Sequence, residues 1–149
     1  MAVDVVTETT IDRPCADVAA YAGDPTNAPA WYADITSVRW QTDPPVRVGS
    51  RIDFVARFLG RTLAYTYEVV ELVPEQRLVM RTAQGPFPME TTYRWRPVAA
   101  GTLMTLRNRG EPSGFGAVAA PLMSVAMKRA NAKDLRALSA LLRRGSQDE

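Results

Sequence analysis

The sequence of 149 residues contains no histidine and a single cysteine, Cys15. Without imidazole or paired thiolate groups, the usual nitrogen and sulfur ligands of zinc and copper cannot be assembled, so we predict no metal site and no cofactor. The same absence removes every catalytic scheme that depends on histidine. Proton transfer would have to use tyrosine, carboxylate, lysine, arginine or ordered water.

Long apolar runs are also missing. The longest, residues 117–123, is far shorter than the ~20 residues that a membrane-spanning helix needs. The amino terminus lacks the basic-then-apolar pattern of a secretory signal, and one cysteine excludes an internal disulfide. We therefore expect a soluble, cytoplasmic protein with one domain over residues 1–145 and a frayed tail at 146–149.

The charged residues indicate no macromolecular partner. Lysine and arginine total 18 against 16 aspartates and glutamates, and the basic residues are scattered along the chain. Alternating arginines are typical of the solvated face of a strand, so no nucleic-acid partner is predicted. A homodimer through an edge strand or a helix stays open.

An apolar side chain recurs at every second residue between Arg51 and Arg109, which predicts strands with one buried face. The β-branched run from Val3 to Ile11 predicts a further strand at the start of the chain. A change in side-chain parity near Glu68 predicts a β-bulge there. The expected strands are residues 3–11, 35–42, 51–58, 63–72, 78–82, 89–95 and 102–109.

Three segments have helix signals. Pro14 to Ala22 and Pro25 to Tyr32 each begin with a proline, which the first turn of a helix tolerates. A 3.6-residue apolar period predicts a long helix from Phe115 to Arg143, with Pro121 expected to kink its first turns. The change of period from two to about 3.6 predicts an α+β fold in which a curved sheet is closed by this C-terminal helix.

The inner face of the predicted sheet combines aromatic, sulfur-containing and hydroxyl-bearing side chains, which is more typical of a pocket wall than of a dry core. The same side chains could instead fill the core by packing. The expected contributors from the sheet are Phe54, Phe58, Tyr65, Tyr67, Met80, Met89, Thr91, Tyr93, Trp95, Met104, Leu106 and Asn108. The expected contributors from the helix are Val118, Leu122, Val125 and Arg129, with Trp31, Phe87 and Phe115 at the mouth.

The order of strand, two short helices, six strands and a long helix resembles that of the SRPBCC superfamily, whose members have START-like and Bet v 1-like helix-grip folds. The polyketide cyclase/dehydrase and lipid transport branch is the most similar. This resemblance implies a seven-stranded curved antiparallel sheet wrapped around the C-terminal helix, with a cavity between them. It does not choose among binding, transport and catalysis. The segments that carry it are residues 11–14, 45–51, 71–79 and 101–106.

Three functions fit these observations. The first is binding or carriage of a hydrophobic small molecule, polyketide-like, lipid-like or isoprenoid-like. The second is an aromatase/cyclase or dehydratase in which a tyrosine or a polarised water donates protons and other polar groups stabilise an enolate; the sequence places no carboxylate inside the cavity. The third is a protein-interaction module. The catalytic candidates are Tyr67, Tyr93, Asn108 and Arg129.

Overall fold

The computed structural model describes residues 3–115 and 119–147, and within them it has a seven-stranded antiparallel sheet and a long C-terminal helix. The sheet order is β1-β7-β6-β5-β4-β3-β2, which confirms the predicted architecture. The elements are β1 (Val3–Ile11), α1 (Cys15–Ala22), η1 (Pro25–Asn27), α2 (Ala28–Trp31), β2 (Ile35–Trp40), β3 (Arg51–Phe58), β4 (Arg61–Val73), β5 (Arg77–Gln84), β6 (Met89–Val98), β7 (Gly101–Gly110) and α3 (Ala120–Gln147).

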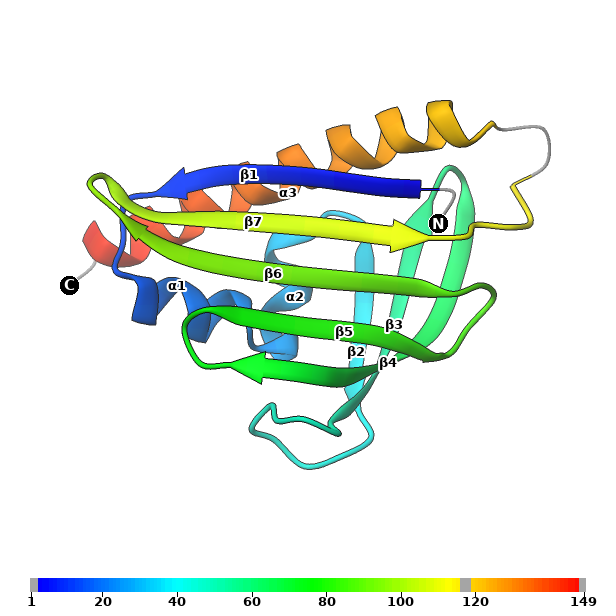
Figure 1. Ribbon diagram of the computed structural model, residues 1–149, viewed down its shortest axis with the longest axis horizontal. Helices are drawn as coiled ribbons and strands as arrows, with labels where there is room; N and C mark the ends of the chain where they lie inside the picture. The colour runs from blue at the N-terminus through cyan, green and yellow to red at the C-terminus, as the bar shows by residue number, and fades with distance from the viewer. Residues whose placement is uncertain (1–2, 116–118, 148–149) are drawn as a thin grey trace.

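All the helices lie toward one face of the sheet (Figure 1). The short helices α1 and α2 lie behind β5 and β6 in this view, and α3 runs along the edge strand β1. Gly23 ends α1, and the Asp24 carboxylate then accepts the Thr26 backbone N–H at 3.0 Å, which starts η1. The segment predicted as one helix from Pro25 to Tyr32 is therefore a 3₁₀ turn followed by one α-helical turn.

The predicted bulge in β4 is confirmed. The pairing of β4 with β5 shifts between Thr66 and Tyr67, and again between Val69 and Glu71. Such irregularities bend a strand and increase its twist. Beyond the second shift, Leu72 packs against the main core. The bulges therefore let one long strand follow the curve of the sheet around its contents.

The long helix begins later than predicted. It starts at Ala120, so Pro121 is its second residue and lies in the first turn. A proline there sacrifices no intrahelical hydrogen bond, and the predicted kink was wrong for this reason. The helix continues to Gln147, beyond the predicted end at Arg143 and into the segment expected to be a tail.

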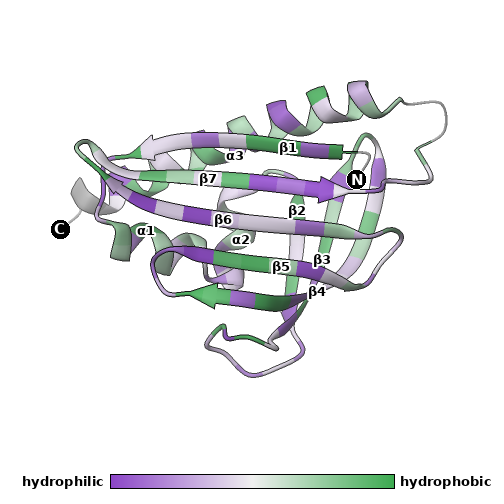
Figure 2. Ribbon diagram, viewed as in Figure 1, coloured by the Kyte–Doolittle hydropathy of each residue, from purple (hydrophilic) through white to green (hydrophobic). Residues whose placement is uncertain are grey.

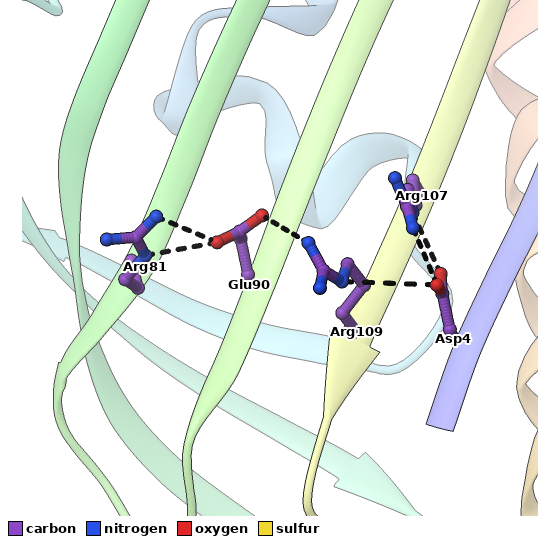
Figure 3. A network of polar contacts seen from close by, with 5 residues as sticks. All are labelled: Asp4, Arg81, Glu90, Arg107 and Arg109. Carbon is purple, nitrogen blue, oxygen red and sulfur yellow. Dashed lines mark hydrogen bonds and ion pairs between the residues drawn. The ribbon is translucent and has the colours of Figure 1, made fainter. Parts of the chain in front are cut away.

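Hydrophilic residues alternate with less polar ones along β5, β6 and β7 (Figure 2), and ion pairs join charged side chains across one face of the sheet. Across four strands, Glu90 pairs with Arg81 at 3.0 Å and with Arg109 at 3.6 Å, and Asp4 pairs with Arg107 at 2.6 Å (Figure 3). The hydrogen bond from Arg107 lowers the pKa of Asp4. These ion pairs are solvated and contribute little to stability.

Candidate functional site

A cavity of about 150 Å³ lies between the inner face of the sheet and the amino-terminal half of α3. Its wall is mostly apolar, with hydroxyl, amide, carboxyl and guanidinium groups at a few positions. Alternation along the strands brings these side chains to one face, as predicted. The predicted residues that line it are Phe54, Phe58, Tyr65, Tyr67, Met80, Phe87, Met89, Thr91, Tyr93, Asn108 and Phe115.

Four of the cavity residues predicted outside the long helix lie outside this wall. Met104 and Leu106 are completely buried, and Trp31 and Trp95 are nearly so; all four pack within the main core cluster. Trp31 is therefore not at the mouth, where it was expected. The short helices α1 and α2 cover this end of the sheet, so its inner side chains meet protein atoms instead of a cavity.

The orientation predicted for the first half of α3 was wrong, whereas Leu135 and Leu138, further along the predicted apolar stripe, are buried. Leu122 and Val125 are 66% and 55% exposed, and Arg129 is also exposed. Met123 and Met127 line the cavity in their place. The prediction chose the stripe richest in large aliphatic residues, whereas the stripe that faces the cavity is partly polar. Val118, also predicted to line the cavity, is outside the described residues.

Two tyrosines form a close pair on the cavity wall. The hydroxyl oxygens of Tyr32 and Tyr93 are 2.6 Å apart, and the ring of Trp31 lies 4.0 Å from that of Tyr32. Burial raises the pKa of both tyrosines, so both hydroxyls stay protonated near neutral pH. Either hydroxyl can donate to the other, which leaves the second proton of the pair for a ligand.

Sequence reasoning missed Tyr32. It directly follows the single turn of α2, and its partner is 61 residues away in β6. A tyrosine next to a buried tryptophan at a helix end was the available signal, but no periodicity indicates the partner.

A second polar group crosses the sheet from β4 to β7. The Thr91 hydroxyl donates to the Asn108 Oδ1 at 2.8 Å, so its oxygen accepts the Tyr67 hydroxyl proton at 2.8 Å. Burial raises the pKa of Tyr67 to about 12, although the bond to Thr91 opposes the change. This chain holds the Tyr67 hydroxyl in place and leaves the Asn108 amide N–H groups for other partners.

The third polar group lies on α3 and was not predicted. Asn131 and Asp134 line the cavity and are only 5% and 3% exposed. The Asp134 Oδ1 accepts the backbone N–H of Ala33 at 3.1 Å. Burial raises the pKa of Asp134 to about 6, while the bond from Ala33 opposes the rise and the charge of Asp34 adds to it. Asp134 therefore exchanges its proton near neutral pH.

Aromatic rings gather at one end of the cavity. The ring of Phe115 lies 5.8 Å from that of Phe58 and 5.9 Å from that of Phe87, both edge to face. The Arg61 guanidinium lies 5.3 Å from the centre of the Phe115 ring. Rings from three separate segments therefore meet where the chain enters α3.

The described residues offer little to a metal ion. Over residues 3–115 and 119–147, no three carboxylate or cysteine side chains come close enough to bind one. In the same residues, no helix has the length and apolarity to cross a bilayer. The side chains of the site can donate hydrogen bonds from neutral tyrosines and amides and exchange a proton at Asp134. The apolar wall excludes water.

Comparison with known proteins gives one family match and several structural matches. A family model described as polyketide cyclase / dehydrase and lipid transport matches residues 2–143. No curated protein sequence matches the chain. A Thermus thermophilus protein is similar in structure with a TM-score of 0.82 at 22% identity, over 96% of this chain and 99% of that one.

Two further solved structures have informative descriptions. A START superfamily protein of Mycobacterium smegmatis has a TM-score of 0.81 at 14% identity, over 95% of this chain and 97% of that one. The Zhui aromatase/cyclase of a Streptomyces species has a TM-score of 0.73 at 15% identity, over 95% and 93%. At these identities, the similarity establishes the shared helix-grip fold and not a shared substrate.

Proposed function

The chain belongs to the polyketide cyclase / dehydrase and lipid transport family, and from this premise we propose that it binds or carries a hydrophobic small molecule in the cavity beneath α3. The observation that carries the proposal is the composition of the cavity wall. Aromatic rings and thioethers surround a space that also holds a few polar groups. Such a wall suits a polyketide-like, lipid-like or isoprenoid-like molecule with few polar atoms.

The size of the cavity limits the ligand. A cavity of about 150 Å³ suits a molecule of about one aromatic ring when the wall does not move. Met80, Met89, Met123 and Met127 lie in the wall, and unbranched thioether side chains change rotamer easily. A larger ligand would enter by moving these side chains.

Binding can be tested with N-phenyl-1-naphthylamine, an uncharged dye that fluoresces in apolar surroundings. Ala130 lines the cavity, so Ala130→Phe fills part of the space and should remove most of the fluorescence gain. Val125→Phe adds the same ring at a residue that is 55% exposed on the same helix, and should leave binding unchanged. Equal binding by both variants would refute the proposal. So would failure of the wild type to bind both the dye and a one-ring compound such as 4-ethyltoluene.

A second candidate function is cyclisation or dehydration of a polyketide-like chain, and the observation that favours it is the buried carboxyl of Asp134. A base whose pKa lies near neutrality is suited to removing a proton next to a carbonyl. The Tyr32 and Tyr93 hydroxyls could then donate hydrogen bonds to the enolate oxygen. Arg129 is exposed and leaves the set of catalytic candidates.

The catalytic alternative predicts a change in products. Wild type, Tyr93→Phe and Asp134→Asn would each be incubated with a reactive poly-β-ketone, and the products separated by mass spectrometry. Catalysis predicts cyclised product with the wild type and at least tenfold less with Asp134→Asn. Identical product profiles in all three would leave ligand binding as the sole candidate of the two.

A further inference from the structure

Asn131 presents an amide without a protein partner to the cavity. Its side chain is 5% exposed, and its Nδ2 has no hydrogen-bond acceptor among the described residues. Buried amide donors are normally paired, because removal from water without a replacement bond is unfavourable. Asn131 also lies in the cavity wall. A hydrogen-bond acceptor inside the cavity would satisfy it.

Asp134, one helical turn further along α3, presents a carboxyl to the same space. Its side chain is 3% exposed, and its Oδ1 accepts the N–H of Ala33. Among the ion pairs of the described residues, none involves this carboxyl. Its other oxygen, Oδ2, can therefore accept a hydrogen bond from a donor in the cavity.

The two side chains are three residues apart, so they share one face of the helix. The Asn131 amide needs a hydrogen-bond acceptor, and the Asp134 carboxyl can accept a hydrogen bond from a donor. A hydroxyl group meets both demands. Its oxygen can accept a hydrogen bond from the Asn131 amide, while its O–H donates a hydrogen bond to the Asp134 carboxylate. An ether or ketone meets only the first demand, and a ligand carboxylate would be repelled by Asp134.

We infer that Asn131 and Asp134 form a subsite that binds a hydroxyl group of an otherwise apolar ligand. This inference rests on the proposed ligand-binding function and specifies its ligand class, a phenol or an alcohol. The hydroxyl end lies against α3, and the apolar body of the ligand lies between the aromatic and methionine side chains of the wall.

Three ligands of nearly the same shape test the subsite. 4-Ethylphenol has both donor and acceptor, 4-ethylanisole has only an acceptor, and 4-ethyltoluene has neither. Their dissociation constants can be measured by isothermal titration calorimetry, which does not depend on uptake of the dye. We expect the phenol to bind about tenfold or more tightly than 4-ethyltoluene, with the anisole between them.

Variants locate the effect. Asn131→Leu and Asp134→Leu should each bring the ratio of the affinities for 4-ethylphenol and 4-ethyltoluene close to one, because either change removes half of the subsite. Lys128→Leu is the control, because it adds the same side chain at an exposed residue of α3 outside the cavity wall, and it should keep the wild-type ratio. Circular dichroism and the affinity for 4-ethyltoluene show whether each variant keeps its fold and its cavity.

The outcomes separate the two proposals. Equal affinities of the wild type for the phenol and the toluene would overturn the hydroxyl subsite while apolar binding stands. A preference for the phenol that survives Asn131→Leu and Asp134→Leu would also overturn it. Binding of neither ligand, with no uptake of the dye, would overturn the proposed function and the subsite together.

Discussion

The buried carboxyl of Asp134 makes the stability of the protein depend on pH in a specific way. Its pKa rises from 3.8 to about 6 on folding. Between these two pH values the folded state binds more protons than the unfolded state, so stability falls as pH rises through this range and levels off above it. Asp134→Asn keeps an oxygen for the Ala33 N–H and cannot ionise, so it should lack this loss.

The magnitude follows from the pKa difference. At 1.36 kcal/mol per pKa unit, the change from 3.8 to about 6 sets an upper limit of about 3 kcal/mol. Relaxation of the protein around a buried charge lowers its effective cost, which reduces the expected effect to about 1 to 2 kcal/mol. The free energy of unfolding of Asp134→Asn, relative to wild type, should rise by this amount between about pH 4 and pH 8.

Urea unfolding at a series of pH values measures this difference. Glu8→Gln is the matched control, because it removes an exposed carboxylate from β1, and it should stay within about 0.5 kcal/mol of wild type. A difference between Asp134→Asn and wild type that stays constant from about pH 4 to pH 8 would refute the reasoning. So would a difference that shrinks as pH rises.

Four other substitutions have clear expectations in urea unfolding. Tyr32→Phe leaves the Tyr93 hydroxyl without its 2.6 Å partner and should cost about 1 to 2 kcal/mol; no loss would mean that the pair is not formed. Leu138→Ala truncates a completely buried side chain and should cost about 2 to 5 kcal/mol, whereas Leu122→Ala, at 66% exposure, should change stability by less than about 0.5 kcal/mol; similar costs would contradict the orientation of α3. Pro121→Ala should change stability by less than about 1 kcal/mol, because a gain near 3 kcal/mol would place the proline in the helix interior.

Alternation of side chains was enough to predict the sheet wall. In a strand, successive side chains point to opposite faces, so one polar residue between two apolar ones fixes which face each occupies. Tyr67, Thr91, Tyr93 and Asn108 were placed in the cavity wall on this basis, and the structure has them there. A strand allows only two orientations of its faces, and several alternating residues in succession indicate the same one.

The face of the first half of α3 could not be predicted in the same way. The rule that the most apolar stripe faces inward assumes that the helix packs on a dry core. This helix covers a cavity with polar positions, so Asn131 and Asp134 face inward while Leu122 and Val125 are exposed. The inward carboxylate was missed for the same reason.

The pairing of Tyr32 with Tyr93 depends on tertiary structure. The two residues are 61 positions apart, and their contact requires that α2 lie over β6. The sequence predicts both elements, but local periodicity does not specify the distance between their side chains.

The central claim is that an apolar molecule binds between the sheet and α3, and methyl labelling of methionine tests it most directly. Met89, Met123 and Met127 line the cavity, whereas Met104 is completely buried in the packed core. With ¹³C-methyl methionine and N-phenyl-1-naphthylamine, we expect intermolecular nuclear Overhauser effects to the three cavity methyl groups and none to Met104. Binding of the dye without any such effect at the cavity methionines would contradict the account.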